Sequence, residues 1–437
     1  MTQKDLIIVF TRYPAPGTTK TRMIPTLGEE GAARLQRKMT LKTVAVCEQY
    51  SLKARAAVEI RYAFHDKNDE HLMKRWLGAT RRYKLQADGD LGARMGNAFT
   101  EAFHNGGRRV IIVGTDSPDL NSGHLRSAFD MLNQSDMVLG PAFDGGYYLI
   151  GLRNNAPLKA ISGLFENISW GTSTVLDETV NNAGLLGISH GLLETLHDVD
   201  RPVDILIWER TQKKLSVIIP TLNEKEHIAD TIKQIEKGTN IEIIAVDGGS
   251  TDGTPEIIKE QGIRCHKSPK GRSNQMNHGF AKSTGKYVLF LHADTILPED
   301  YDVIVRSALD ADNIICGAFK LGIDTPGIKL RIIEAATHFR AKYMQMPYGD
   351  QALFMMRQTF DELGGFPDMP VMEDYEFVRR MKRSGRIGIV PSKVITSGRR
   401  WEKRGVVRTT LINQLVIVGY LLGVSTEKLA RLYYGKQ

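Results

Sequence analysis

Short apolar runs alternate with amphipathic segments along the whole chain, and this alternation restricts the possible folds more than any other feature. Strand-like runs that alternate with helical segments are typical of parallel βα units. In the first half we expect strands at residues 6–10, 59–64, 83–86, 109–113 and 137–140, and helices at 29–48 and 92–104.

The alternation starts again with "LSVIIP" at residues 215–220, directly after the polar stretch 209–214. The 437 residues are also too many for one hydrophobic core. We therefore expect two tandem α/β domains, residues 1–210 and 214–437. Each should be a Rossmann-like three-layer domain with a mainly parallel sheet.

Each half ends a mid-domain strand with an aspartate, Asp116 after "VIIVGT" and Asp294 after "YVLFLHA". Ligands of parallel α/β folds bind outside the carboxyl ends of the strands. An aspartate at such a place could instead start a turn before Pro298 or cap a helix. The matching positions in the two halves favour a ligand site.

The cysteine usage and the first apolar run indicate where the protein works. Cys47, Cys265 and Cys316 are far apart and form no Cys-x-x-Cys pair, which fits a reducing compartment. The run at residues 6–10 is too short for the core of a signal peptide. We therefore expect a cytoplasmic protein.

The net charge of +8 is concentrated in the second half, and after Arg379 only Glu402 and Glu427 are acidic. Such a segment attracts phosphorylated ligands, anionic lipid or nucleic acid. Nucleic acid is not expected, because the segment has no recognisable reader motif and no aromatic ladder. Residues 411–424 are mostly apolar but fall short of the roughly 20 residues that span a bilayer. A docked helix is favoured, and peripheral membrane contact is the alternative.

Two turns follow the first strands of the second half, "PTLNE" at residues 220–224 and "DGGSTDGT" at 247–254. Gly248 lets the backbone approach a ligand closely, and Asp247 could accept a hydrogen bond from a ribose or a base. A glycine-rich βα turn with Asp252 as a cap is the alternative. The glycine spacing does not match the dinucleotide-binding fingerprint.

Five motifs of the second half, "LSVIIPTLNE", "AVDGGSTDGT", "KGRSNQMNHG", "FLHADT" and "MEDYEFVRRM", together resemble the family 2 glycosyltransferases with the GT-A fold, over about residues 214–410. The resemblance implies a nucleotide-sugar donor and a Mg²⁺ or Mn²⁺ ion that stabilises the leaving diphosphate. It makes Asp294 the last acid of the Asp-x-Asp metal motif, and His292 stands where the first aspartate is usual.

The resemblance also implies an inverting reaction, with Asp374 as general base and Glu373 beside it. The alternative is that both acids complement the dipole of a helix at residues 375–382. "SGRRWEKRG" resembles a degenerate Gln-x-x-Arg-Trp element, in which a guanidinium binds phosphate and an indole stacks on a sugar. The candidate donor-binding residues are Pro220, Thr221, Glu224, Asp247, Gly248, Arg272, Asp350, Gln351, Arg400 and Trp401.

The first half opens with the loop "FTRYPAPGTTKTRMIP", in which Arg12, Lys20 and Arg22 could hold phosphates. It is not a Walker loop, because Thr19 stands where that loop needs glycine.

Further motifs, "GTDSPDL", "GPAFDGGYYLIGL", "WGTSTVL" and "LHDVDRPVDI", resemble the nucleotidyltransferase-like radical-SAM/selenodomain-associated transferase 1 proteins over about residues 5–205. The second half correspondingly resembles the transferase 2 subgroup, of the arsenosugar-biosynthesis type. By this resemblance Asp116 ligates a metal, and Asp144 or the pair Asp198 and Asp200 completes the shell.

The combined expectation is an inverting, metal-dependent glycosyltransferase that uses a nucleotide sugar, fused to a nucleotidyltransferase-like domain. A membrane-surface enzyme acting on a polyprenyl phosphate or other lipid is one alternative, and a non-catalytic scaffold that binds nucleotide sugars is another. The sequence leaves open the sugar, the base, the small-molecule or lipid acceptor and the oligomeric state.

Overall fold

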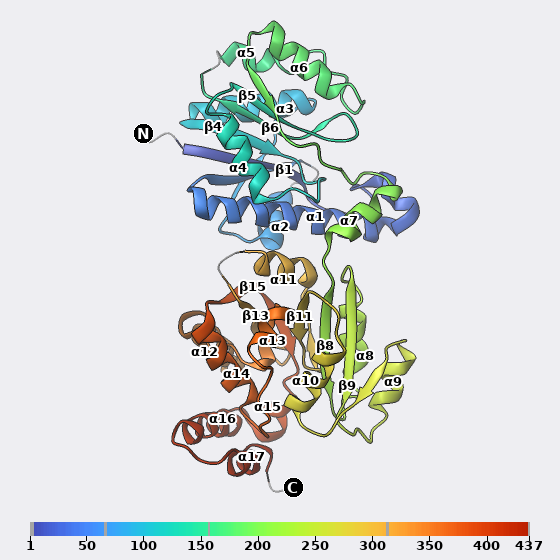
Figure 1. Ribbon diagram of the computed structural model, residues 1–437, viewed down its shortest axis with the longest axis vertical. Helices are drawn as coiled ribbons and strands as arrows, with labels where there is room; N and C mark the ends of the chain where they lie inside the picture. Colours follow the sequence, from blue (N-terminus) through green and yellow to red (C-terminus); the bar gives the residue numbers. More distant parts are fainter. Residues whose placement is uncertain (1–3, 65–67, 156–157, 312–313, 436–437) are drawn as a thin grey trace. The chain divides into compact units, whose positions relative to one another are not determined.

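Two units, residues 1–211 and 212–437, make up the chain, each built around one mixed β-sheet (Figure 1). The computed structural model describes residues 4–64, 68–155, 158–311 and 314–435. No helix within these ranges is both long enough and apolar enough to cross a membrane.

The sheet of the first unit has the strand order β3-β2-β1-β4-β6-β5-β7. Its strands are β1 (Lys4–Arg12), β2 (Ala57–Ala63), β3 (Arg82–Leu85), β4 (Gly107–Val113), β5 (Met137–Pro141), β6 (Tyr147–Arg153) and β7 (His190–Leu192). Its helices are η1 (Thr21–Met23), α1 (Ile24–Ala54), α2 (Asp69–Leu77), α3 (Leu91–His104), α4 (Ser122–Met131), α5 (Leu158–Gly163), α6 (Val175–Leu185), η2 (Pro202–Asp204) and α7 (Ile205–Thr211).

Helices cover both faces of this sheet because its strands are apolar on both sides. Successive strand side chains point to opposite faces. Ile7 and Val9 accordingly pack in one hydrophobic cluster with residues of α1, α2 and α4. Ile8, between them, belongs to a second cluster with residues of α3, α5 and α6. The first unit is therefore a three-layer domain.

The first unit contains strands β6 and β7, which the sequence reading did not include. β6 is antiparallel to both β4 and β5, whereas the other pairings in the sheet are parallel. The chain returns from β5 to β6 through a tight turn in which Gly145 has a φ of +90°, where a side chain would be strained. A search for parallel βα units misses such a hairpin.

The sheet of the second unit has the order β10-β9-β8-β11-β14-β13-β15-β12. Its strands are β8 (Leu215–Thr221), β9 (Ile241–Asp247), β10 (Cys265–Lys267), β11 (Tyr287–Phe290), β12 (Thr295–Ile296), β13 (Cys316–Ile323), β14 (Phe354–Met356) and β15 (Ile387–Thr396). Its helices are α8 (Ile228–Ile235), α9 (Thr254–Glu260), α10 (Arg272–Lys282), α11 (Tyr301–Leu309), α12 (Ile328–Met344), η3 (Gly349–Gln351), α13 (Arg357–Glu362), α14 (Glu373–Ser384), α15 (Arg399–Arg404), α16 (Val406–Leu421) and α17 (Thr426–Tyr434).

The second unit repeats the layered arrangement. Val217 and Ile219 of β8 pack with α8, α9 and α11, whereas Ile218 packs with α10 and α14. β8, β9 and β11 are parallel neighbours, so their carboxyl ends meet at one edge of the sheet. The prediction of two α/β domains with mainly parallel sheets is confirmed.

Candidate active site

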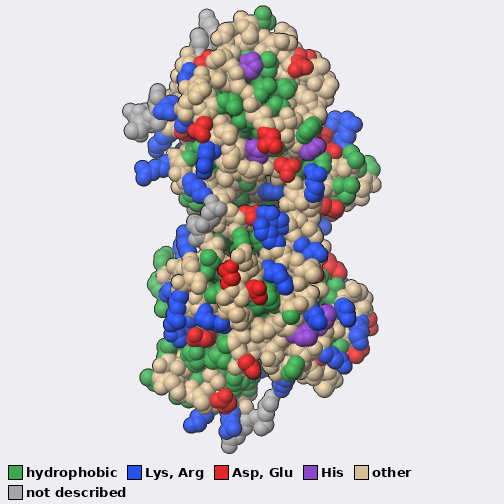
Figure 2. Space-filling model, viewed as in Figure 1, with side chains coloured by type: hydrophobic (Ala, Val, Ile, Leu, Met, Phe, Trp, Pro, Cys, Tyr) green, Lys and Arg blue, Asp and Glu red, His purple; other side chains and the backbone are tan. Residues whose placement is uncertain are grey.

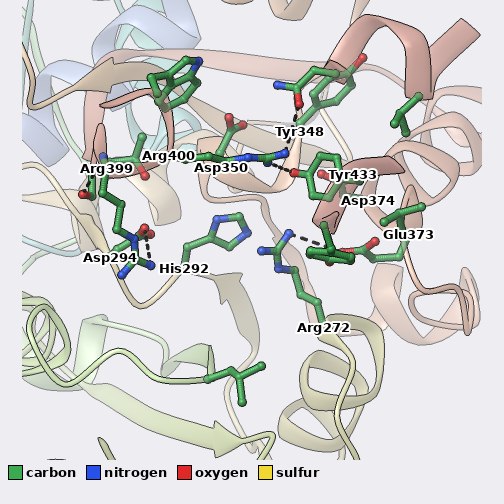
Figure 3. Close-up of a pocket in the computed structure, with 18 of the residues that line it drawn as sticks. Arg272, His292, Asp294, Tyr348, Asp350, Glu373, Asp374, Arg399, Arg400 and Tyr433 are labelled. Atoms are coloured by element: carbon green, nitrogen blue, oxygen red, sulfur yellow. Dashed lines mark hydrogen bonds and ion pairs between the residues drawn. The ribbon is translucent and has the colours of Figure 1, made fainter. Parts of the chain in front are cut away.

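A pocket of about 540 Å³ lies at the carboxyl ends of β8 and β11 in the second unit (Figure 3). Its volume falls in the range of ligand-binding cavities. The sequence-predicted residues on its wall are Glu224, Arg272, Asp294, Asp350, Glu373, Asp374, Arg400 and Trp401.

One side of the pocket is formed by two carboxylates that share one guanidinium group. Nη2 of Arg399 lies 2.5 Å from Oε1 of Glu224 and 3.2 Å from Oδ2 of Asp294. The other oxygen of Glu224, Oε2, is buried and has no hydrogen-bond partner among the described residues. Burial raises the pKa of Glu224, and the Arg399 charge opposes that shift. The carboxylates of Asp294 and Glu224 thus both contact the guanidinium group of Arg399.

A second acidic pair begins helix α14. Asp374 accepts hydrogen bonds from the backbone N–H groups of Gly349 at 2.8 Å and Tyr375 at 2.7 Å, which fix its carboxylate. Glu373 is buried, and its Oε1 lies 3.7 Å from Nη1 of Arg272. Burial and then the Asp374 charge raise the pKa of Glu373, which favours its protonated form.

His292 and Asp374 converge on Gly349. A Cβ added at Gly349 would lie 3.2 Å from both His292 Nε2 and Asp374 Oδ2. Burial and the nearby Arg272 charge lower the pKa of His292, so its imidazole is neutral at physiological pH.

Asp350, the residue after Gly349, is a further acid of the pocket, and burial raises its pKa to about 6. Its Oδ1 has no hydrogen-bond partner in the described part of the chain.

The far wall of the pocket comes from the C-terminal helices. α16 contributes Asn413, Val416 and Ile417, and α17 contributes Tyr433 and Tyr434.

Arg400 is engaged with this wall. Its guanidinium lies over the Tyr433 ring, 3.8 Å from the centroid, and donates a hydrogen bond to the Tyr433 hydroxyl. Trp401 lines the pocket and also packs against a small hydrophobic cluster around Leu330.

In the first unit, the aspartate after β4 is paired with a lysine of the loop after β1. Lys20 Nζ lies 2.7 Å from Asp116 Oδ1 and donates to the backbone carbonyl of Val199. The Lys20 side chain is only 3% exposed. Arg22 of the same loop pairs with Asp200, whereas Arg12 is exposed.

Asp198 lies among other acids of the first unit. Burial raises the pKa of Asp198 to about 6, and the charges of Asp144, Asp204 and Asp116 act in the same direction. In neither unit do three His, Cys, Asp or Glu side chains of the described ranges gather closely enough to hold a metal ion alone.

Two family models match the chain. Residues 46–172 match the family described as "Uncharacterized protein conserved in bacteria (DUF2064)". Residues 216–364 match "Glycosyl transferase family 2".

A curated relative supports the second match. A PGL/p-HBAD biosynthesis glycosyltransferase of Mycobacterium bovis (strain BCG / Pasteur 1173P2) is 29% identical over 252 residues, an alignment that covers 45% of this chain and 96% of the relative. The second unit contains a glycosyltransferase domain.

Solved structures with similar chains include two transferases. A candidate nucleotide-diphospho-sugar transferase from Desulfovibrio desulfuricans G20 is 33% identical, with a TM-score of 0.44, and the match covers 48% of this chain and 89% of that one. The mannosyltransferase PcManGT from Pyrobaculum calidifontis, solved with GDP-Man and Mn²⁺, is 19% identical, with a TM-score of 0.38 and coverages of 51% and 71%.

Several predicted donor residues of the glycosyltransferase domain are absent from the pocket wall as the described residues form it. The Asp247 carboxylate is used in its own turn, where it accepts hydrogen bonds from the N–H of Gly249 at 2.9 Å and of Ser250 at 3.1 Å. Gln351 is fully buried and donates to the Phe319 carbonyl at 2.9 Å.

The other residues outside the wall are also held by local contacts. Pro220 and Thr221 are the last two residues of β8, and the Thr221 hydroxyl donates a hydrogen bond to the Val246 carbonyl at 3.2 Å. A Cβ at Gly248 would lie 3.0 Å from Gln275. A donor-binding role for these residues stays a prediction.

Sequence reasoning missed Arg399 and the aromatic wall of the glycosyltransferase site. "SGRRWEKRG" offers two adjacent arginines, and only the fold shows that Arg399 reaches Asp294 while Arg400 reaches Tyr433. Tyr348 also lines the pocket, with the Arg340 guanidinium 3.4 Å from its ring centroid. The tyrosines of α17 carry no motif that marks them as pocket residues.

Proposed function

We propose that the second unit transfers a sugar, with inversion, from a nucleotide sugar to an acceptor hydroxyl. The observation that supports this most is that one pocket holds Asp294 and Arg399 at one side and Glu373 and Asp374 at the other (Figure 3). Glu224 pairs with the same Arg399. The cluster around Arg399 can bind the diphosphate of a donor, and the Glu373–Asp374 pair can take a proton from an acceptor. An inverting displacement needs these two functions in one cavity.

Asp294 and Glu224 fit a divalent cation, Mg²⁺ or Mn²⁺, because both carboxylates already converge on one positively charged nitrogen. The buried, unpartnered Oε2 of Glu224 is a further available oxygen ligand. Mg²⁺ usually takes only one or two protein carboxylates and completes its shell with substrate phosphates and water. Such an ion would neutralise the charge of the leaving diphosphate. Arg399 and Arg272 supply further positive charge on the pocket wall.

Asp374 is the proposed general base. Two backbone N–H groups hold its carboxylate in one orientation, which pre-organises it toward the acceptor hydroxyl. The raised pKa of Glu373 makes that residue a neighbour that can stay protonated, so that it does not repel a second carboxylate. Neutral His292 lies on the same side without adding charge.

For the first unit we propose a nucleotidyltransferase-like domain of the radical-SAM/selenodomain-associated type, with the second unit in the arsenosugar-biosynthesis subgroup. Arg12, Arg22 and Lys20 are the candidate phosphate-binding residues and Asp116 is the candidate metal ligand. A ligand would have to displace Lys20 from its ion pair with Asp116. Besides burial, the negative charges of Asp144 and Asp116 raise the pKa of Asp198, which supports the metal role, because negative charge attracts a cation. These side chains do not gather closely enough to hold an ion alone, so substrate oxygens would have to complete its shell.

The acceptor is a small molecule or a lipid. A membrane-surface enzyme that acts on a polyprenyl phosphate is the second candidate, because α16 lines the pocket and also exposes several large apolar side chains. We propose that the protein works in the cytoplasm, in the lipid case at the inner membrane face. The free thiols Cys47, Cys265 and Cys316 fit that compartment.

Calorimetry with a panel of nucleotide sugars, with and without Mn²⁺, tests the proposal. We expect one donor to bind in a metal-dependent way and Asp294→Asn to weaken it at least about tenfold. Asp361→Asn, at an exposed position of α13, is the matched control and should not change binding. If the Asp294 variant bound the donor as tightly as the wild type, Asp294 would not be a metal ligand. A donor that binds but stays intact with every acceptor would identify the scaffold alternative.

A further inference from the structure

Helix α16 exposes one continuous apolar stripe. Val407, Leu411, Leu415 and Val418 of α16 and Leu422, which caps its end, follow one another at intervals of three or four residues, and each is between 49% and 78% exposed. Surface helices normally turn such a stripe toward the core. The buried residues of α16 are Thr409 and Val416, on another side. Helix α16 therefore packs on the domain with one side, as predicted, and exposes an apolar stripe on the other.

Helix α12 carries a second stripe of the same kind. Ile328, Ile332, Phe339 and Tyr343 are between 60% and 79% exposed and are spaced by four and seven residues, so they share one face. The opposite face is buried through Leu330, Glu334, Thr337 and Ala341.

The start of α16 packs against α12. Leu330 and Ile333 of α12 pack in one cluster with Val406, the first residue of α16. Figure 2 shows hydrophobic side chains gathered over the region where Figure 1 places α12 and α16, with Lys and Arg side chains beside them. We call the two stripes together the α12–α16 face.

The α12–α16 face is rimmed by positive charge. Lys329, Arg331 and Lys342 of α12 and Arg408 of α16 are all exposed, as is Lys403 at the end of α15. The sequences of α12 and α16 contain one acid, Glu334, which is buried and paired with Arg331 and Lys393.

We propose that the α12–α16 face docks the protein on a bilayer surface that carries anionic phospholipids. An apolar stripe flanked by Lys and Arg is the composition of helices that lie in the membrane interface. The anionic headgroups attract the basic rim, and the acyl region accepts the Leu, Ile and Phe side chains. A second copy of this chain is a poor occupant, because a symmetric contact would bring the two basic rims together.

Docking in this way places the active site beside the lipid surface. Asn413, Val416 and Ile417 line the pocket from α16, whose other side carries the stripe. An acceptor anchored in the membrane could then reach Asp374 without leaving the interface. This part of the inference rests on the proposed function and names its acceptor class as an amphiphile. The docking itself needs neither donor nor acceptor.

Co-sedimentation of the full chain with vesicles tests the docking. One set of vesicles contains only neutral phosphatidylcholine and the other also contains anionic phosphatidylglycerol. We expect binding to the anionic vesicles that weakens as salt is raised. The double variant Leu411→Ser/Leu415→Ser should lose about tenfold or more of this binding. The reversal Arg408→Glu should weaken binding to anionic vesicles alone.

The matched control is Leu52→Ser/Leu185→Ser, at positions of the first unit that are 80% and 86% exposed. It should bind vesicles like the wild type. All four leucines are exposed, so the thermal unfolding of both double variants should match the wild type.

The inference is overturned if the wild type does not bind anionic vesicles or if the Leu411/Leu415 variant binds them equally well. Concentration-dependent self-association that this variant abolishes, without vesicle binding, would assign the face to a second copy. Calorimetry with donors on the same variant keeps the two proposals separate. Vesicle binding without donor binding rejects only the proposed function, and the reverse result rejects only the docking.

Discussion

Both units place an aspartate after a central strand and pair it with a basic side chain, but the two pairs are built differently. In the first unit, Lys20 is 3% exposed and is held between Asp116 and the Val199 carbonyl. In the second, Arg399 is 34% exposed and is shared between Asp294 and Glu224 on the wall of a pocket.

The difference shows that a common strand-end position does not fix a common use. The Lys20 ammonium is enclosed and its hydrogen bonds tie the loop after β1 to residues near Val199, as a structural residue does. The Arg399 guanidinium faces a cavity and can exchange one partner for another. We infer that the second unit is organised for catalysis and that any ligand of the first unit must compete with an existing ion pair.

The largest expected effect is the loss of sugar transfer in Asp374→Asn. An amide cannot take the acceptor proton, so kcat should fall about 10²- to 10⁴-fold while donor binding stays within about twofold. Asp116→Asn, at the strand end of the first unit, should leave transfer unchanged. Equal losses in both variants, measured by donor turnover, would break the contrast between the units.

Gly349→Ala should lower kcat about tenfold, because the new Cβ would press on His292 and Asp374 at 3.2 Å and shift the base. The control is Gly184→Ala in α6 of the first unit, where a Cβ would meet no heavy atom of the described residues within 4 Å. Steady-state kinetics should show a change in kcat with little change in donor KM. A wild-type kcat in the Gly349 variant would show that the position of Asp374 does not depend on the space at Gly349.

Lys20→Met should destabilise the first unit by about 1–3 kcal/mol, since it leaves the buried Val199 carbonyl without its donor. Arg399→Gln should lower the stability of the second unit by less, because the ion pairs of Arg399 border solvent in the pocket. Hydrogen exchange of peptides from each unit, at increasing urea concentration, separates the two effects. A larger loss in the Arg399 variant would reverse the assignment of structural and functional roles.

The smallest effect concerns pH, and it should be alike in the two units. Burial raises the folded-state pKa of both Asp350 and Asp198 to about 6, from a usual value near 3.8. Stability is therefore lost as pH rises from about 4 to 6 and stays lost above. Asp350→Asn and Asp198→Asn should each raise Tm by about 3 °C at pH 8 and leave it unchanged at pH 4. A gain that is equal at both pH values would exclude these titrations as its cause.

The sequence by itself determined the two α/β domains with mainly parallel sheets, because strand and helix periodicity is local and survives without knowledge of contacts. It also placed Asp294 after β11 and the Glu373–Asp374 pair at the start of α14, since a strand end and a helix start are marked by neighbouring residues. Strand β6 was missed, because its antiparallel pairing with β4 joins segments that lie far apart in the chain.

Only the tertiary structure decided which polar groups share a site. Arg399 and Glu224 are 175 residues apart in the chain, and no local pattern distinguishes Arg399 from Arg400. Asp247 is the last residue of β9, and its carboxylate accepts hydrogen bonds within its own turn, whereas Asp294 follows β11 and faces the pocket. The exposed stripe of α12 likewise depends on which side of the helix is covered. The direction and partners of a side chain follow from packing across the fold, and packing is the information that a single sequence does not display.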